Sequence, residues 1–352
     1  MDKNMHETNP NHNSQVYNNF PKVELHRHLE GSLRVSTLKE IALAHQLSFS
    51  DHINLEALVQ VQPDDPLTFA NFLSKFQPLR LFYQSPQIIT RVVQESIADA
   101  AAENIQHLEL RFTPVALARA QGYPLSEVMD WVISSAQQAA RQFHISISLI
   151  ASVNRHESVQ LAQEVARLAM ERGPSGIAGL DLAGNEAEFP ALQFAGILHE
   201  AQKSGLKITI HAGEWGGAQN VREAIEDLHA DRIGHGVRVL EDPRVVDLAR
   251  ERQLPFEVCV TSNCQSGVCA SVHNHPICRM LEAGLNVTIN TDDPGISNIT
   301  LSSEYQLLSE SLGFSTTQLR ERVLAAVDAS FLTANQKQAL HAKLASQFQI
   351  EN

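Results

Sequence analysis

Apolar residues recur along the chain in short runs that alternate with longer amphipathic stretches. The runs are rich in Val, Ile and Leu, and most are followed by Gly, Pro, Asn or Asp, as is typical of strands that end in turns. Between them lie patterns of helical period, such as residues 191–205, where Gly205 marks the expected helix end. The expected strands are residues 23–28, 105–112, 145–153, 177–184, 207–214, 232–237, 255–262 and 286–293.

Strands that alternate with helices imply parallel pairing, and eight such units in one chain predict a (β/α)8 barrel of the TIM type. A doubly wound open sheet is the alternative fold. Residues 33–104 are too many for a single crossover, so we expect extra helices after the first strand, which could cover the barrel mouth. Residues 1–18 are polar, rich in Asn and without periodicity, which predicts a disordered tail before one barrel domain over residues 19–352.

Titratable and glycine residues gather where the expected strands end. A barrel collects its active site at the carboxyl ends of its strands, so this placement favours the barrel over the open sheet. The residues at these ends are His26, His28, Gly184, His211, Glu214, His235, Asp292 and Asp293.

The pair His26 and His28 has the spacing of neighbouring side chains on one face of a strand, which aims two imidazoles at the barrel axis. His211 and Asp292 end two other strands and should meet them there. Three imidazoles and one carboxylate suit a zinc ion with an open position for water, although iron or another divalent ion could use the same ligands.

A metal of this kind lowers the pKa of its water to about 7, so the expected reaction is attack of hydroxide on an electrophilic carbon. His235, in "IGHGV", is the expected base or orienting group beside the water. Glu214, in "HAGE", is the expected acid on the leaving side of the substrate. Asp293 is expected to accept a hydrogen bond from the substrate or another side chain, and its alternative role is an Asx turn that caps the next helix.

The net charge of −13 disfavours binding to nucleic acid or to an acidic membrane surface. The chain has no run of about 18 apolar residues and no basic-then-apolar signal at its start, so we expect a cytoplasmic protein with a small-molecule partner. The four cysteines lack the C-x2-C pairs of a zinc knuckle, which favours free thiols. They are Cys259, Cys264, Cys269 and Cys278.

Six motifs, in this order, closely resemble those of the adenosine deaminase family of metal-dependent amidohydrolases. They are "PKVELHRHLEG", "GLDLAGNE", "HAGE", "RIGHGV", "FEVCVTSN" and "VTINTDDPG". Each motif alone is weak, but their order and spacing make the resemblance specific over nearly the whole chain from Pro21.

The resemblance implies an enzyme that deaminates the purine ring of adenosine or 2′-deoxyadenosine at C6 through a zinc-activated water, releasing ammonia. Glu214 would give a proton to ring N1, and His235 would orient or deprotonate the water. Asp293 would bond the N7 side of the ring, and the backbone amide of Gly184 would contact N3. The implied ligands of one zinc ion per subunit are His26, His28, His211 and Asp292.

Glu30, in "HLEG", departs from the better-known adenosine deaminases, which carry an aspartate there for the ribose 5′-hydroxyl. The glutamate form also resembles adenine deaminases and relatives that act on larger nucleosides such as aminodeoxyfutalosine. These substrates are the alternatives, with Glu30 expected to contact the substrate in each case. A phosphorylated purine is disfavoured, because the chain has no glycine-rich phosphate loop and no cluster of Arg or Lys near the strand ends.

Overall fold

Each expected strand run contains a strand, and each strand pairs in parallel with the next one along the chain. The computed structural model describes residues 16–47 and 54–350. The strands of this sheet are β1 (Lys22–His28), β2 (Ile105–Phe112), β3 (Ser146–Asn154), β4 (Ile177–Ala183), β5 (Lys207–Ala212), β6 (Arg232–His235), β7 (Pro255–Val258) and β8 (Asn286–Ile289).

The two edges of the sheet meet through the segment that follows β8. The backbone N–H of Asp292 donates to the carbonyl of His26 at 2.9 Å, and the N–H of His28 donates to the carbonyl of Asp292 at 2.8 Å. The N–H of Leu25 donates to Oδ1 of Asn290 at 2.9 Å. These bonds close the sheet, so the predicted (β/α)8 barrel is confirmed and the open sheet is not formed.

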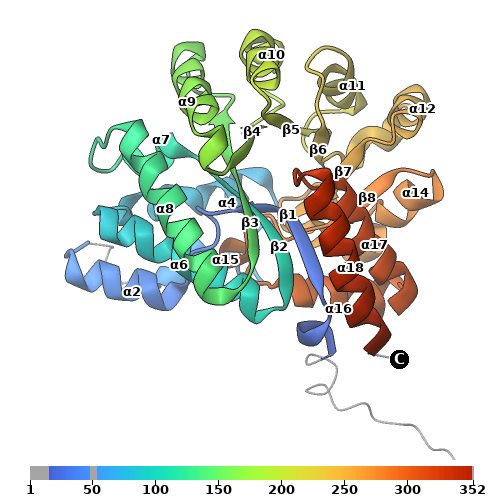
Figure 1. The fold of residues 1–352 in the computed structure, drawn as a ribbon, viewed down its shortest axis with the longest axis horizontal. Coiled ribbons are helices and arrows are strands. Elements are labelled where there is room, and N and C mark those ends of the chain that lie inside the picture. The colour runs from blue at the N-terminus through green and yellow to red at the C-terminus, as the bar shows by residue number, and fades with distance from the viewer. Residues whose placement is uncertain (1–15, 48–53, 351–352) are drawn as a thin grey trace, which may run out of the picture.

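Helices follow each strand and surround the barrel (Figure 1). The helix predicted within residues 191–205 is present as η3 and α10, and Gly205 follows it with φ +100°. After β2 to β8 come α7 (Pro114–Ala118), α8 (Leu125–Phe143), α9 (Val159–Glu171), η2 (Gly173–Ser175), η3 (Leu192–Phe194), α10 (Ala195–Lys203), α11 (Ala218–Glu226), η4 (Val237–Glu241), α12 (Pro243–Glu251), α13 (Val260–Gln265), η5 (Val272–Asn274), α14 (Ile277–Glu282), α15 (Pro294–Ser297), α16 (Leu301–Leu312), α17 (Thr316–Ala329) and α18 (Ala334–Ile350).

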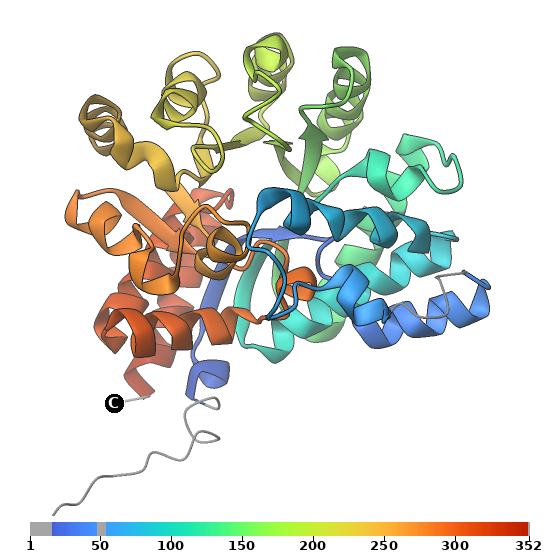
Figure 2. The same cartoon turned by 180° about the vertical axis from the view of Figure 1, so that it is seen from behind.

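The expected extra helices between β1 and β2 are confirmed, and in Figure 2 several of them lie in the foreground, in front of the strands. Side-chain caps begin three of them, as when the Ser85 hydroxyl accepts from the N–H of Ile88. In the described residues this insertion comprises α2 (Val35–Ala44), α3 (Leu55–Val59), α4 (Phe69–Ser74), α5 (Phe76–Leu79), η1 (Arg80–Phe82) and α6 (Pro86–Ala102).

Several boundaries differ from the sequence prediction, and the strand expected at residues 286–293, for example, ends at Ile289. The run expected at residues 255–262 is a strand only to Val258, and its β-branched end belongs to α13, where the N–H of Thr261 donates to Glu304 at 3.1 Å. Tertiary contacts thus override local strand propensity. Residues 1–15 of the predicted tail lie outside the described residues, whereas residues 16–19 are helical and the Lys22 ammonium donates to the carbonyl of Tyr17 at 2.6 Å.

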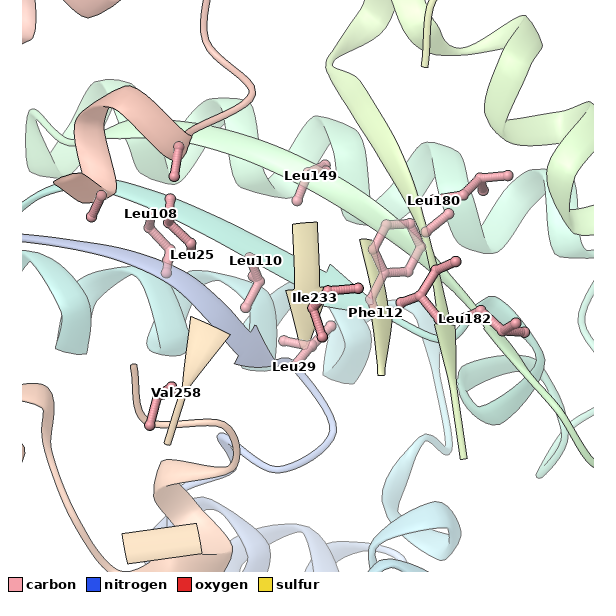
Figure 3. Packing of buried hydrophobic residues seen from close by; sticks show 14 of the residues in the cluster. Leu25, Leu29, Leu108, Leu110, Phe112, Leu149, Leu180, Leu182, Ile233 and Val258 are labelled. Carbon is pink, nitrogen blue, oxygen red and sulfur yellow. The ribbon is translucent and has the colours of Figure 1, made fainter. Parts of the chain in front are cut away.

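The strands alternate between an apolar outer face and a polar inner face. Leu108 and Leu110 of β2, and Leu180 and Leu182 of β4, belong to the apolar layer drawn in Figure 3. The intervening side chains carry charge inside the barrel, as with the Arg111 to Asp181 pair at 3.5 Å. The core therefore lies mainly between strands and helices, which leaves the barrel interior to titratable groups.

Two expectations from composition can be compared with the described residues. Within them, no helix combines the length and hydropathy needed to span a bilayer. All four cysteines are free thiols, as predicted, and three of them are buried. None of them belongs to a group with metal-ligand geometry in the part of the chain that the structure describes.

Candidate active site

The four predicted metal ligands meet at the carboxyl end of the barrel. Asp292 Oδ1 lies 3.2 Å from Nε2 of His26 and 3.3 Å from Nε2 of His28. Nε2 of His28 lies 3.3 Å from Nε2 of His211. His235 is close enough to be a ligand as well, since His26, His211, His235 and Asp292 each offer an atom within 4.8 Å of the others.

Buried carboxylates fix the orientation of two of these imidazoles. Glu257 accepts from Nδ1 of His26 at 2.7 Å, and Asp181 accepts from Nδ1 of His211 at 2.9 Å. With Nδ1–H donating, each ring presents a lone pair at Nε2, and Nε2 of His26 is buried without a hydrogen-bond partner among the described residues. Converging lone pairs beside a carboxylate fit a bound divalent cation.

Two site residues have a left-handed backbone, which is costly for residues other than glycine. His235 has φ +57° and Asp292 has φ +69°. Strand alternation would place His235 on the outer face with Ile233, and the left-handed turn at the end of β6 brings its ring to the site instead. Position 234 favours glycine, because a Cβ there would lie 3.1 Å from Cε1 of His26.

Three carboxyl groups at the mouth have no Lys or Arg partner among the described residues, and burial favours their protonated forms. Burial and the nearby Asp292 raise the pKa of Glu214 well above its usual range. Burial and Asp292 also raise the pKa of Asp293, whose Oδ1 lacks a hydrogen-bond partner among described residues. Burial raises the pKa of Glu30 to about 7, although its carboxyl accepts from the N–H of Thr113 at 2.6 Å.

Glycines allow the close approaches that this site requires. A Cβ on Gly31 would lie 1.8 Å from Oδ1 of Asp293, so only glycine fits beside that carboxyl. Gly184, at the end of β4, has φ +95° and lines the cavity as predicted.

Glu186 is a site residue that the sequence analysis did not select. Its carboxylate accepts from the backbone N–H groups of Gly213 at 2.9 Å, Glu214 at 2.6 Å and Trp215 at 2.6 Å. It therefore holds the loop that carries Glu214. Glu186 is the last residue of the motif "GLDLAGNE", and that position is the only signal for it in the sequence.

A cavity of about 370 Å³ opens above these groups, a size typical of small-molecule sites. The insertion supplies an apolar wall, in which Phe69 stacks on Trp215 with ring centroids 4.3 Å apart. Every predicted site residue lines the cavity except His26, which lies beneath it and is fully buried. The cavity is also lined by Arg80 and His156, which the sequence did not mark as substrate contacts.

The family model for adenosine deaminase matches residues 21–347. The chain belongs to the adenosine deaminase family. An adenosine deaminase of Shigella dysenteriae is 35% identical over 331 residues, which cover 93% of this chain and 98% of that protein. This membership makes the chain a deaminase and its His and Asp cluster a candidate metal site of a metal-dependent family.

Solved structures of the adenosine deaminase family differ in what they bind or act on. An adenine deaminase from Arthrobacter aurescens has a TM-score of 0.85 at 27% identity, covering 94% of this chain and 99% of that one. A zinc-bound amidohydrolase from Burkholderia ambifaria has a TM-score of 0.89 at 25% identity, with 99% and 95% coverage. The Arabidopsis protein ADAL complexed with IMP has a TM-score of 0.83 at 28% identity, with 94% and 98% coverage.

Proposed function

We propose that this protein deaminates adenosine and 2′-deoxyadenosine at C6, giving inosine or 2′-deoxyinosine and ammonia, in the cytoplasm. The observation that carries the proposal is the Glu214 carboxyl, which is 13% exposed and whose Oε2 lies 3.6 Å from Nε2 of His235 at the edge of the His and Asp cluster. A carboxyl that stays protonated near neutral pH can give a proton to a ring nitrogen. A binding protein would gain nothing from that arrangement.

The proposed ligands are His26, His28, His211 and Asp292, and the proposed ion is zinc. This choice is supported by the imidazole and carboxylate donors, which zinc commonly takes, and by the zinc in the Burkholderia ambifaria structure. Zinc held there would lower the pKa of a water molecule to about 7.

The chain's own groups would bind the purine and move protons. Asp293, protonated, can donate to N7, and the backbone amide of Gly184 can contact N3. Glu214 gives its proton to N1 and regains one from water, while the water oxygen bonds to C6 and the bond from C6 to the amino nitrogen breaks. One water proton thus restores Glu214, and the other leaves on the ammonia.

The test offers purified, zinc-loaded protein adenosine, 2′-deoxyadenosine, adenine and adenosine monophosphate, with purine absorbance and ammonia release as readouts. Turnover should be fastest with the two nucleosides. Faster turnover of adenine would assign the free base instead, and no reaction with any of the four would refute purine deamination.

Replacing Glu214 by Gln keeps its shape but removes the acid. We expect kcat to fall about 1000-fold, within the range for a general acid, while zinc content and thermal stability stay unchanged. Loss of zinc from this variant would mean that Glu214 is a ligand and not the acid.

A purine nucleoside monophosphate is a second candidate substrate, and Arg80 is the observation that favours it. Its half-buried guanidinium lines the cavity and makes no hydrogen bond or ion pair with any residue in the described ranges. A guanidinium in that position can bind a phosphate group. The related Arabidopsis structure with bound IMP supports the same reading.

A further inference from the structure

A buried chain of hydrogen bonds lies behind His235. Nδ1 of His235 contacts Nδ2 of Asn263 at 3.2 Å, and Oδ1 of Asn263 contacts Nε2 of His275 at 3.2 Å. The backbone N–H of Ile277 donates to Nδ1 of His275 at 3.1 Å. Asn263, within α13, and His275, before α14, thus connect a site residue to the backbone.

The direction of every bond in this chain follows from its backbone end. A backbone N–H can only donate, so Nδ1 of His275 accepts and carries no proton. The neutral ring then has its proton on Nε2 and donates it to Oδ1 of Asn263. The amide of Asn263 is thereby turned so that Nδ2–H faces His235, whose Nδ1 must accept.

The geometry points to Asn263 and His275 as positioning residues that hold His235 in its neutral Nε2–H tautomer. In that form His235 donates a hydrogen bond to the attacking water oxygen and has no lone pair at Nε2 with which to remove a proton. This inference rests on the proposed function, because it assumes that the attacking water lies beside His235.

The surroundings of Nε2 agree with a donor. Two carboxyl groups lie on its side, with Oε2 of Glu214 at 3.6 Å and Oδ2 of Asp292 at 4.0 Å, and the ionised Asp292 can only accept. A general base would need the proton on Nδ1 instead, where it would face the Nδ2–H of Asn263. A protonated Nε2 also keeps His235 out of the ligand set despite its short distance to His26 and His211.

Burial opposes reversal of the donor and acceptor roles in these hydrogen bonds. The exposed fractions of His235, Asn263 and His275 are 1%, 0% and 4%. Two donors facing each other there would leave both unsatisfied, which is costly for buried polar groups. Burial also lowers the pKa of His275 to about 3, so this ring stays neutral at physiological pH.

Nitrogen NMR on protein labelled with 15N-histidine tests the tautomer directly. We expect Nδ1 of His235 to give the signal of an unprotonated nitrogen and Nε2 that of a protonated one, in both metal-free and zinc-loaded protein. The spectrum of His235→Gln assigns the signals. A protonated Nδ1 in the wild-type protein would overturn the inference.

Asn263→Asp replaces the amide with a group of the same shape that only accepts. His235 should then move its proton to Nδ1, which the same spectra would record, and lose its donor at Nε2. We expect kcat to fall about 100-fold or more, as for loss of an oxyanion donor, with KM changed by less than about threefold. A kcat kept within about threefold would overturn the inference, because His235 would then work as a base.

Two further comparisons separate this role from structural damage. Gln265→Glu makes the same change at the half-buried last residue of α13, two positions after Asn263, and should keep kcat within about threefold. His275→Gln can still donate to Asn263 and should keep most activity, whereas His275→Glu can only accept and should reproduce the loss. Equal loss in both His275 variants would refute the relay. Failure of the wild-type protein to deaminate any purine would refute the proposed function and leave the NMR result standing.

Discussion

Carboxylates inside this barrel fall into two layers that differ in their partners. In the lower layer, Glu257 accepts from Arg111 at 2.8 Å, from Nδ1 of His26 at 2.7 Å and also from Arg232. Despite full burial, these cations hold the pKa of Glu257 well below its usual range. In the upper layer, Glu214 and Asp293 have no such cation and their pKa values are raised.

The lower layer supports the structure of the site, whereas the upper layer offers groups that can react. The carboxylates of the lower layer have hydrogen-bond and ion-pair partners within the protein and hold the His26 imidazole in place. Their charges are therefore neutralised by protein groups. The upper layer keeps carboxyl groups that can donate protons at the cavity, where a substrate or metal would supply the missing partners.

The largest effect should come from breaking the lower layer. Glu257→Gln leaves Arg111 and Arg232 buried with less negative charge, so we expect the free energy of unfolding to fall by about 3–5 kcal/mol. Chemical denaturation at pH 7 measures it. Zinc affinity should fall too, because the His26 imidazole loses its acceptor.

Glu321→Gln is the control, since Glu321 is 58% exposed and its contact with Arg322 is 4.0 Å long. Its effect should stay within about 0.5 kcal/mol. If the Glu257 variant were as stable as the control, the two layers would not differ in their structural role.

Much of the fold and the site could be read from the sequence because the signals were local. The strand alternation placed His26 and His28 on one face, and glycine positions such as Gly184 marked strand ends. The barrel then brought these ends together, so all nine predicted site residues meet without any long-range prediction.

The residues that the sequence did not reveal act through contacts between distant segments. Glu186 matters because its carboxylate reaches the loop at Glu214, and Glu257 because it reaches His26 across the barrel. Asn263 directly follows a run that looks like a strand, but the end of that run is helical and contacts Glu304 through Thr261. No periodicity encodes such contacts.

Glu304 resembles the upper-layer carboxyls but lies outside the cavity. Among the described residues it has no Lys or Arg partner. It is buried and accepts from the N–H and hydroxyl of Thr261, and burial raises its pKa from 4.5 to about 7. In the unfolded chain Glu304 ionises at lower pH than in the folded protein. As pH rises from 5 to 8, this difference should lower the free energy of unfolding by on the order of 2–3 kcal/mol.

Glu304→Gln should remove that loss. Unfolding free energies of wild type and variant, measured at pH 5 and pH 8, should therefore differ more in favour of the variant at pH 8. A difference that does not change with pH would mean that Glu304 is ionised in the folded protein. Activity should be unaffected apart from stability, which would show that a raised pKa alone does not mark a catalytic group.

Arg80 gives the smallest expected effect and bears on substrate choice at the upper layer. Arg80→Gln should raise KM for adenosine monophosphate about tenfold, which corresponds to about 1.4 kcal/mol of binding free energy for one half-exposed contact with phosphate. The same variant should change KM for adenosine less than twofold. Steady-state kinetics with both substrates measure the ratio. Arg119→Gln is matched in charge, but Arg119 already donates to Glu157 at 2.6 Å and should leave both values within twofold. If both variants raised KM for adenosine monophosphate equally, Arg80 would act only through the overall electrostatic field at the cavity mouth. If Arg80→Gln raised KM equally for both substrates, Arg80 would not recognise the phosphate.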